Sequence, residues 1–334
     1  MQLVTGGAGF IGSNYIHYIL GKHPNEQVIC LDALTYAGNL TSLSDALQCP
    51  RLHFVHADIA DPHAVEAVFA RYHPDVVVNF AAESHVDRSI DQPMPFVRTN
   101  VLGTAQLLDA ALRHGVKRFH QVSTDEVYGD LPLEGEQCFV EGDVLRPSSP
   151  YSASKASADL LVLAYHRTFG LPVTVSRAGN NYGPYQFPEK LIPLCITHAV
   201  RGQPTPVYGT GANVREWLHV EDHCRAIDHI LAHGREGDVY NVGGETRCDN
   251  LSLVRTILRL TGAPDTLWQY VADRKGHDRR YALDCTKLRA LGWRPTVPFD
   301  EGLSDTVHWY LTHEAWCRAI QTGKYRNVPI PTDN

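Results

Sequence analysis

Long apolar runs and an excess of positive charge are both missing from this sequence. No stretch of about 18 consecutive apolar residues occurs, so we expect no membrane-spanning helix. The formal net charge of −7 over 334 residues argues against a general binder of nucleic acid or of anionic membranes. Met1 leads directly into an expected strand and a glycine-rich loop, which leaves no room for a signal peptide. We therefore expect a cytoplasmic protein.

Paired cysteines and the spacings of metal ligands are also absent. The 8 cysteines are scattered without a Cys-x-x-Cys pair, which is typical of reduced thiols that mostly fill the core. The 18 histidines include no His-Glu-x-x-His pattern, and we expect no metal site. What remains is ordinary globular composition, with 43% hydrophobic and 20% charged residues. The length suits one large α/β domain or two smaller ones.

A glycine-rich loop follows the first expected strand. Gly6, Gly9 and Gly12 lie between that strand and an expected helix. Glycine lets the backbone turn tightly and approach a pyrophosphate, which then rests on the helix N-terminus. The next expected strand ends at Asp32, whose carboxylate can accept both hydroxyls of an adenosine ribose and would repel a 2′-phosphate. A glycine loop alone could be a turn that binds no phosphate, but this order of elements predicts an NAD site.

Two later strand ends extend the predicted cofactor site. Asp58 and Ile59 follow the third expected strand, where such a pair can flank an adenine ring. The alternative there, a helix cap by Asp61, is compatible with that role. Ala81 and Ala82 follow a nearly all-apolar strand of the central parallel type. Small residues at that strand end leave room for a cofactor at the crevice of the sheet.

Five side chains predict proton-transfer chemistry. An apolar strand ends in Thr124, Asp125 and Glu126, and Tyr151 and Lys155 follow at helical i, i+4 spacing. Lys155 would lie beside the Tyr151 phenol and lower its pKa, so that the tyrosine can take a proton from a sugar hydroxyl. The adjacent acids can divide acid and base work if their surroundings separate their pKa values. Each part has an ordinary alternative, since Tyr-x-x-x-Lys occurs by chance and an Asp-Glu pair is often a solvated loop.

Two long apolar helices are expected over 96–114 and 151–169. Their apolar faces are wider than one narrow stripe, so the two helices could form a homodimer interface as a four-helix bundle. Burial against the chain's own sheet is the alternative, and the sequence does not separate the two. Further along, Arg274, Arg279 and Arg280 form a cationic loop in an acidic protein. A nucleotide diphosphate is a good partner for this loop, whereas surface ion pairs are the alternative.

The chain resembles the extended short-chain dehydrogenases/reductases, and more closely the nucleoside-diphosphate-glucose 4,6-dehydratases, above all the dTDP-glucose enzymes. The resemblance covers Val4 to about Tyr310, and its most specific segments are 34–39, 81–89, 123–129, 180–186 and 276–281. It implies that Tyr151, with Lys155 and Thr124, helps to oxidise the sugar at C4, that Glu126 is the base at C5 and that Asp125 protonates the C6 hydroxyl. Loss of water and reduction at C6 then give a 4-keto-6-deoxy sugar nucleotide.

The resemblance also implies further contacts. For NAD these are Phe10, Ile11, Asp32, Leu34, Thr35, Asp58, Ile59, Ser84, Thr99 and Asn181. For the nucleoside-diphosphate sugar they are Ser84, Asp125, Asn180, Lys190, Leu191, Pro206, Tyr208, Arg215, Asn250, Asp273, Arg274 and His277. The implied fold is α/β, a Rossmann doubly wound parallel sheet with a smaller C-terminal α/β substrate-binding domain. We expect the NAD-binding domain over 1–178, with parts of 220–250 returning to it, and a mainly sugar-nucleotide-binding domain over 179–330.

Two departures from the family pattern and two alternative functions stay open. Gly179 stands where relatives more often have a Cys or Ser side chain near the sugar pocket, and Glu216 stands where Asp is frequent. A 4-epimerase or decarboxylase could use the same scaffold, although these usually lack the acid pair. A catalytically silent NAD-binding regulator is the alternative from another class. The sequence does not decide which nucleobase is preferred.

Overall fold

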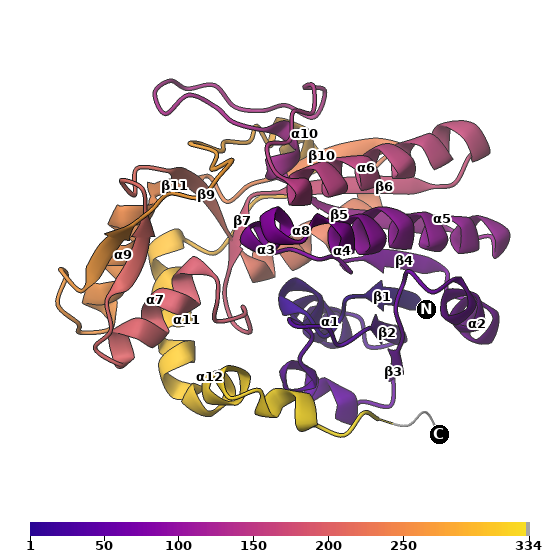
Figure 1. Cartoon of the computed structure of the whole chain (residues 1–334). Coiled ribbons are helices and arrows are strands. Elements are labelled where there is room, and N and C mark those ends of the chain that lie inside the picture. The colour runs from indigo at the N-terminus through magenta and orange to yellow at the C-terminus, as the bar shows by residue number, and fades with distance from the viewer. Residues whose placement is uncertain (332–334) are drawn as a thin grey trace.

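A seven-stranded parallel sheet forms the larger part of the protein, which is described here from a computed structural model covering residues 1–331. The strand order is β10-β6-β5-β4-β1-β2-β3, so the chain starts in the middle of the sheet and winds outward in both directions (Figure 1). This is the doubly wound arrangement predicted from the sequence. The strands are β1 (Gln2–Thr5), β2 (Val28–Asp32), β3 (Leu52–His56), β4 (Val76–Asn79), β5 (Arg118–Thr124), β6 (Val173–Ala178) and β10 (Asp238–Val242).

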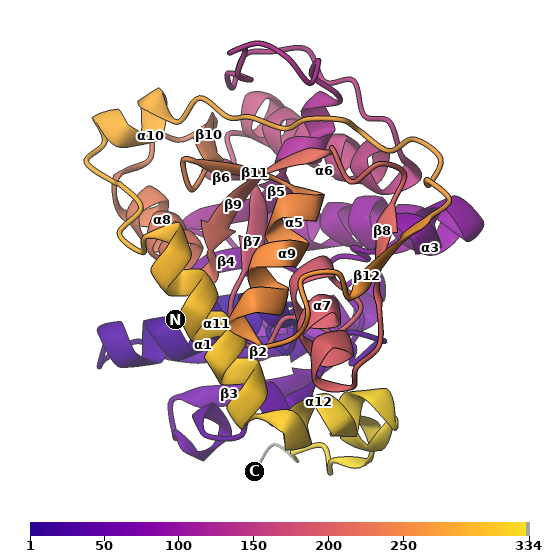
Figure 2. The same cartoon turned by 90° about the vertical axis from the view of Figure 1, so that its left-hand side faces the viewer.

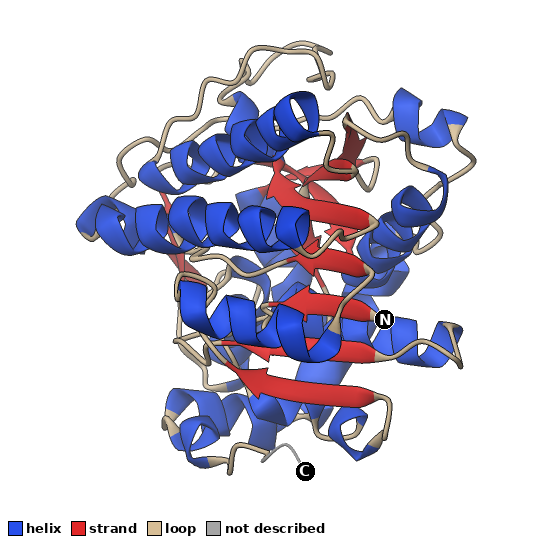
Figure 3. Cartoon of the chain, turned by 90° about the vertical axis from the view of Figure 1, so that its right-hand side faces the viewer, coloured by secondary structure: helices blue, strands red, loops and turns tan. Residues whose placement is uncertain are grey.

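Helices cover both faces of this sheet (Figure 3). Successive residues of a strand point to opposite faces, so Leu3 packs under one helical layer and Val4 under the other. One layer contains α2 (Pro62–Tyr72), α5 (Thr104–Arg113) and α6 (Pro150–Phe169). The other contains α1 (Phe10–Lys22) and α8 (Val220–His233). Burial on both faces explains why the central strands read as nearly continuous apolar runs.

The helix expected over 96–114 is wrong as a single regular α-helix. Val97–Gly103 form a π-helical turn (η3) that is followed by α5, and two short helices precede it, α3 (Val86–Asp91) and α4 (Pro93–Phe96). The wider turn brings the Asn100 side chain to the backbone of Glu83. Its Oδ1 accepts the Glu83 N–H at 2.8 Å, and its Nδ2 donates to the Glu83 carbonyl oxygen at 3.0 Å. It also donates to Ser154 Oγ at 2.8 Å. A buried amide with three partners thus ties the end of β4 to α6.

A smaller unit lies beside the carboxyl edge of the large sheet (Figure 2). It has a three-stranded sheet, β11-β9-β7, and a two-stranded sheet, β12-β8. Its apolar core joins α7, α9 and α11 through side chains such as Ile196, Leu258 and Leu303. The elements are β7 (Asn180–Tyr182), α7 (Leu191–Val200), β8 (Thr205–Tyr208), β9 (Val214–His219), β11 (Thr246–Asp249), α9 (Asn250–Leu260), β12 (Trp268–Val271), α10 (Thr286–Ala290), α11 (Phe299–Thr312) and α12 (Glu314–Gln321).

The polar and turn-rich segment 180–190 begins with the strand β7, which pairs with β9. The region 300–320 is divided into two helices, because the chain leaves the first helix at His313. β11, β12 and α10 had no sequence signal that we used. No helix among the described residues is long and apolar enough to cross a membrane. All eight cysteines are free, and five of them are buried.

Candidate active site

A cavity of about 610 Å³ opens at the carboxyl ends of the parallel strands, where the glycine-rich loop meets β2, β4 and β5. In an open α/β sheet this crevice is where ligands bind. Most of the residues predicted to hold the cofactor line it. They are Gly6, Gly9, Phe10, Ile11, Gly12, Asp32, Thr35, Asp58, Ile59, Ala81, Ala82, Ser84, Thr99, Tyr151 and Lys155.

The glycine loop leaves no space for side chains on the wall of the cavity. A Cβ added at Gly12 would lie 2.3 Å from the carbonyl oxygen of Gly6, and one at Gly6 would lie 2.7 Å from the amide nitrogen of Ala81. Gly6 also has φ +66°, a conformation that favours glycine. The tight loop brings backbone N–H groups and the start of α1 to the cavity. These residues therefore fit the pyrophosphate of a dinucleotide.

Asp32 is held at the end of β2 with its carboxylate at the cavity. Its two oxygens accept the N–H groups of Leu34 at 2.8 Å and of Ala8 at 2.9 Å. Burial raises the pKa of Asp32, and these two N–H bonds act in the opposite direction. Each carboxylate oxygen has a second lone pair, so the fixed carboxylate can still accept ribose hydroxyls. At the far end of the cavity, Asp58 forms an ion pair with Arg98 at 2.8 Å.

Two residues predicted at the cofactor do not line this cavity. Leu34 has a positive φ of 49°, and it lines a separate cavity of about 210 Å³ instead. The Asn181 side chain is occupied elsewhere, because it donates to the Gly179 carbonyl at 3.0 Å and contacts His223 Nδ1 at 2.9 Å. The turn after Asp32 directs the Leu34 side chain away from the large cavity, and the strand β7 does the same for Asn181. We predicted neither the turn nor the strand from the sequence.

Sequence reasoning missed several cavity residues as individual contacts. Tyr36, Arg98, Gln186, Phe187 and Glu189 all line the cavity. Tyr36, Gln186 and Phe187 lie in or beside motifs that carry the family resemblance, which was the available signal. Arg98 lies in the π-helical turn, and the geometry of that turn directs its side chain toward Asp58. The regular α-helix that we expected over this segment did not predict this position for Arg98.

The strand β5 carries three catalytic candidates, Thr124, Asp125 and Glu126, which follow the lining residues Val122 and Ser123 but do not themselves line the cavity. Thr124 is the N-cap of a 3-10 turn, η4 (Asp125–Tyr128), and its Oγ1 accepts the Glu126 N–H at 3.2 Å. The same hydroxyl donates to Asp125 Oδ1 at 3.2 Å. Asp125 is only 2% exposed, and its other oxygen has no hydrogen-bond partner among the described residues. A buried carboxyl with a free oxygen is unusual in a folded protein and is typical of a functional group.

Tyr151 and Lys155 lie in the first turns of α6. Ser149 caps this helix in a capping box with Ser152, and Pro150 occupies its first position, so the start of the helix is well defined. The Tyr151 ring packs against Phe96 at 6.3 Å between centroids and lines the cavity. Lys155 Nζ donates to the Val122 carbonyl oxygen at 2.6 Å. α6 thus holds the tyrosine and the lysine at the cavity, and β5 holds Asp125 and Glu126 close enough to Tyr151 to act on its pKa.

The predicted fall in the pKa of Tyr151 is wrong for this structure. Burial raises its pKa well above the ordinary value, and the neighbouring carboxyls of Glu126 and Asp125 add to the rise. A side-chain hydrogen bond with Thr124 acts against it. Burial also lowers the pKa of Lys155 to about 8, which weakens the cation that was expected to acidify the phenol. Two nearby acids and a dry site outweigh one lysine that is bonded to the backbone.

The two acids have different surroundings. Burial raises the pKa of Asp125 well above its usual value, and Glu126 and Glu216 raise it further, while Arg215 acts against them. Burial also raises the pKa of Glu126, but three cations, Arg274, Arg215 and Lys190, act against that rise. Asp125 therefore favours its protonated form more strongly than Glu126 does.

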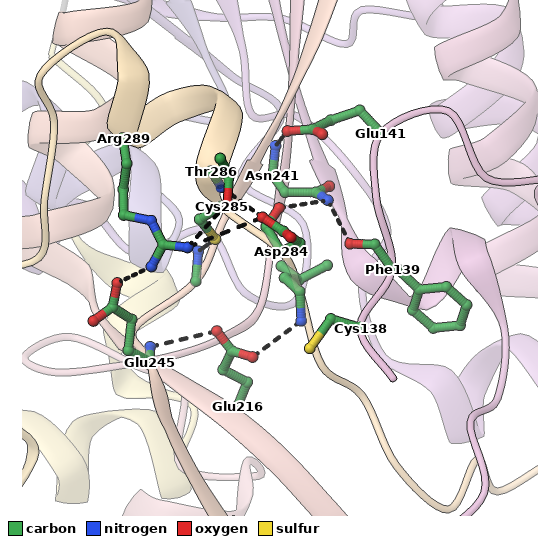
Figure 4. Close-up of polar contacts among 12 residues, drawn as sticks. Cys138, Phe139, Glu141, Glu216, Asn241, Glu245, Asp284, Cys285, Thr286 and Arg289 are labelled. Atoms are coloured by element: carbon green, nitrogen blue, oxygen red, sulfur yellow. Dashed lines mark hydrogen bonds and ion pairs between the residues drawn. The ribbon is translucent and has the colours of Figure 1, made fainter. Parts of the chain in front are cut away.

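Glu216, one of the two departures from the family pattern, lies behind Asp125 in a buried polar network. Its carboxylate pairs with Arg247 at 3.2 Å and accepts the N–H of Leu283 at 3.1 Å. A Cβ added at Gly179 would touch both acidic residues, at 3.0 Å from the Glu216 carbonyl oxygen and 3.8 Å from Asp125 Oδ2. Gly179 thus lies between Asp125 and Glu216. Figure 4 shows the network around Glu216, with Cys138, Phe139, Glu141, Asn241, Glu245, Asp284, Cys285, Thr286 and Arg289.

The predicted substrate residues extend from the cavity into the smaller unit. Lys190 lines the cavity and donates to the Ser84 carbonyl oxygen at 3.1 Å. Arg215 donates to the Asp278 carbonyl oxygen at 2.8 Å, and Arg274 forms an ion pair with Asp87 at 3.7 Å. Lys190, Arg215 and Arg274 all act on the pKa of Glu126. Arg279 instead forms a surface ion pair with Asp130 at 2.6 Å, which was the alternative for this loop, and Arg280 donates to the Pro132 carbonyl oxygen at 2.6 Å.

The other predicted substrate residues surround this cluster less closely. The side chains of His277 and Asp273 contact each other at 2.6 Å, and the His277 ring meets Tyr208 edge to face at 6.2 Å. Asn180 begins β7 and Asn250 begins α9, and both side-chain oxygens are buried without a partner among the described residues. Leu191 begins α7 and Pro206 lies in β8, but neither lines the large cavity. Within residues 1–331, no set of three His, Cys, Asp or Glu residues has the arrangement of a metal site.

Comparisons with known proteins match this geometry. A family model described as GDP-mannose 4,6 dehydratase matches residues 3–306. The chain is 53% identical over 325 residues to a dTDP-glucose 4,6-dehydratase of Streptomyces antibioticus, covering 96% of this chain and 95% of that protein. A crystal structure of the dTDP-glucose 4,6-dehydratase of Streptomyces venezuelae with NAD bound has a TM-score of 0.92 and 49% identity, covering 96% and 99% of the chains. The UDP-glucose 4-epimerase of Thermotoga maritima has a TM-score of 0.86 and 31% identity, covering 94% and 99%.

Proposed function

The chain belongs to the dTDP-glucose 4,6-dehydratase family of extended short-chain dehydrogenases/reductases, and from this premise we propose how its own side chains perform the reaction. It is an NAD-dependent hydro-lyase that converts dTDP-glucose to the 4-keto-6-deoxy sugar nucleotide. The observation that supports our assignment of roles is the position of Asp125 and Glu126 beside the Tyr151 phenol, whose pKa both acids raise. A dehydration needs an acid and a base on one sugar, and this end of the cavity offers both.

NAD, when bound, would accept a hydride from the sugar and later return it. Tyr151 takes the proton of the C4 hydroxyl, and Thr124, which is linked to both Asp125 and Tyr151, orients the phenol. The form of Tyr151 that accepts this proton is the phenolate, and Lys155, fixed through its bond to the Val122 carbonyl oxygen, stabilises it until the proton arrives. The resulting 4-ketone makes the C5 hydrogen acidic.

Glu126 and Asp125 then remove water across C5 and C6. Glu126 takes the C5 proton, because its three neighbouring cations favour the ionised form. Asp125 gives its proton to the departing C6 hydroxyl, because its buried position favours the protonated form. The two acids are consecutive in the chain, so the turn η4 sets their relative position.

The test is incubation of the purified protein with dTDP-glucose and mass spectrometry of the product. We expect a sugar nucleotide lighter by one water. Asp125→Asn and Glu126→Gln should each slow product formation by about 10²–10⁴-fold. Glu134→Gln is a matched control, since Glu134 is exposed in the loop before α6. Failure of the cofactor-loaded protein to convert any nucleoside-diphosphate hexose would overturn the assignment.

A 4-epimerase or decarboxylase on the same scaffold is the second candidate, because an epimerase shares the fold at 31% identity. An epimerase yields a product of unchanged mass, and a decarboxylase yields one that has lost carbon dioxide, so the same spectrum separates the three reactions. We also propose that the larger unit holds NAD and that 179–330 mainly hold the sugar nucleotide. Assays with dTDP-, UDP-, GDP- and CDP-glucose would rank the nucleobases.

We propose in addition that the protein forms a homodimer through α5, α6 and the turn before α5. Leu160 is 59% exposed on α6, and Met94, Val97 and Leu102 are exposed on or next to the neighbouring helical segments. Unpartnered apolar side chains on two adjacent helices suit a four-helix bundle with a second copy. Leu160→Glu should give a monomer in light scattering, whereas Leu311→Glu, at an exposed leucine of α11, should leave the mass unchanged. Equal masses for both variants and the unaltered protein would contradict this interface.

A further inference from the structure

The segment after α12 lies against the outer wall of the cofactor cavity. It passes through η5 (Lys324–Asn327) and continues beside the region of α1 and β3, nearly three hundred residues away in the sequence (Figures 1 and 2). Tyr325 is the best-buried residue of this segment, with 5% exposure. A large side chain buried near the end of a chain indicates a contact that orders the segment.

Tyr325 bonds directly to the loop that follows Asp32. Its hydroxyl donates to the Tyr36 carbonyl oxygen at 2.6 Å. The same hydroxyl accepts from Arg326 Nε at 3.1 Å, which fixes its orientation. The single O–H of Tyr325 is thus used in the bond to Tyr36, while its oxygen accepts from Arg326.

Three aromatic rings from distant parts of the chain meet at this point. The Tyr325 ring packs edge to face on Phe187 at 6.1 Å between centroids, and Phe187 packs in the same way on Tyr36 at 5.9 Å. Tyr36 and Phe187 line the cofactor cavity, whereas Tyr325 does not. Tyr325 therefore contacts the cavity only through the two residues that form its wall.

The inner side of this wall is also held. The Arg88 guanidinium lies 3.8 Å from the centre of the Tyr36 ring and pairs with Glu189 at 3.1 Å. Glu189 belongs to the same segment as Phe187 and lines the cavity as well. These contacts join the loop after β2, at Tyr36, to the segment before α7, at Phe187 and Glu189. We call this part of the cavity lining the Tyr36–Phe187 wall, and Tyr325 packs on its outer side.

The remainder of the loop has less support. A cavity of about 210 Å³ lies between the loop and the C-terminal segment; it is lined by Leu34, Gly38 and Leu40 of the loop and by Tyr325, Arg326, Val328 and Ile330 of the segment. Val328 packs against the core cluster that contains Leu40, whereas the Tyr325 hydroxyl connects the segment to the cavity wall at Tyr36. Loss of that connection should let the wall move away from the cavity.

We infer that Tyr325 is a positioning residue that holds the Tyr36–Phe187 wall closed and so retains the reduced dinucleotide during each catalytic cycle. The inference rests on the proposed function, in which the cofactor must end each cycle as it began. An enzyme that loses NADH before the last step releases a 4-keto sugar and becomes inactive until NAD is supplied again. Retention is therefore a separate requirement from chemistry in this reaction.

The experiment measures dinucleotide release directly. NADH is bound to wild type, Tyr325→Phe and Tyr325→Ala, and its fluorescence is followed after mixing with excess NAD. Loss of one hydrogen bond in Tyr325→Phe should speed release by about fivefold, and loss of the ring in Tyr325→Ala by more than tenfold, as order-of-magnitude expectations. Tyr270→Phe and Tyr270→Ala are matched controls, since Tyr270 in β12 is 56% exposed and does not contact the cavity.

A second measurement separates retention from simple stability. Without added NAD, Tyr325→Phe should stop earlier than wild type during dehydration, and added NAD should restore its progress curve. A merely structural role would lower the melting temperature without changing the release rate. Equal NADH release rates for wild type and Tyr325→Phe overturn the inference. Because release is measured without any sugar, this result is independent of whether the protein dehydrates dTDP-glucose.

Discussion

Two glycines of the same helix should respond to alanine in opposite ways. Gly12 and Gly21 both lie in α1. A Cβ at Gly12 would lie 2.3 Å from the Gly6 carbonyl oxygen and 2.9 Å from Gly7 Cα, which are backbone atoms that cannot rotate away. A Cβ at Gly21 would meet nothing within 4 Å. Alanine at Gly21 therefore measures the effect of helix propensity alone, and alanine at Gly12 adds the steric effect of packing against the glycine-rich loop.

The magnitudes follow from these two environments. Gly21→Ala gains helix propensity, which should stabilise the protein by about 0.5–1 kcal/mol. Gly12→Ala gains the same amount but must displace the Gly6 loop by about 1 Å, and such overpacking costs about 1–3 kcal/mol or more. With an unfolding entropy of about 2.1 cal/mol/K per residue, 1 kcal/mol corresponds to roughly 1.4 °C for a chain of 334 residues. We expect about +1 °C for Gly21→Ala and a fall of about 1–3 °C for Gly12→Ala.

The assay combines thermal unfolding of the cofactor-free protein with titration of NAD. Gly12→Ala should also bind NAD at least about tenfold more weakly, because the displaced loop no longer presents its N–H groups to the pyrophosphate. Gly21→Ala should keep the wild-type affinity. If both variants changed the melting temperature in the same direction and bound NAD like wild type, the close approach of Gly12 to Gly6 would not be a feature of the folded protein.

Three further predictions concern buried charge. The pKa of Asp125 is higher in the folded than in the unfolded protein, so the wild-type protein loses stability as the pH rises from about 4 upward. The melting temperature of Asp125→Asn should therefore rise relative to that of wild type between about pH 4 and pH 8. A difference in melting temperature that stays constant over this range would contradict the prediction. Because Glu126 must be ionised to act and its pKa is raised, the dehydration rate should fall on the acid side at a higher pH than a free glutamate gives, and Glu126→Gln should remove that dependence. Asp159→Asn leaves Arg177 buried and unpaired and should cost about 3–5 kcal/mol in urea unfolding. Glu314→Gln breaks an exposed pair and should cost less than about 1 kcal/mol.

Most of the larger unit could be predicted because its signals are local. An apolar strand, a glycine loop, a helix and a terminal acid occur in order, and β1, α1 and β2 form where that order places them. The helix over 96–114 was predicted without its π-helical turn, because the spacing of apolar residues along the sequence does not reveal a turn that contains one extra residue. What stabilises that turn is the bond between Asn100 and Glu83, a contact between segments that only the folded chain brings together.

The smaller unit was harder to predict for the same reason. β7 covers three residues, Asn180–Tyr182, and two of them are asparagines, a residue type that is depleted in strands. They are extended because they pair with β9, a strand more than thirty residues later. Leu34 and Asn181 remain predicted cofactor contacts, but neither lines the large cavity, because a turn and a strand pairing that depend on the tertiary fold direct their side chains. Motif matching could select the correct segments but not the orientation of each side chain.

The division of labour between the two acids shows what the folded chain adds to the motif. The residue types of Thr124-Asp125-Glu126 do not distinguish the two acids, since both are carboxyls at the end of one strand, and only the family resemblance assigned Glu126 as the base. The cations that act on Glu126 are Lys190, Arg215 and Arg274, and all three come from the segment after residue 178. Asp125 has only Arg215 among these and has Glu216 as an additional acidic neighbour. Burial raises the pKa of both acids, and the cations of the smaller unit oppose that rise more at Glu126 than at Asp125, which is the basis of the different roles that we propose for them.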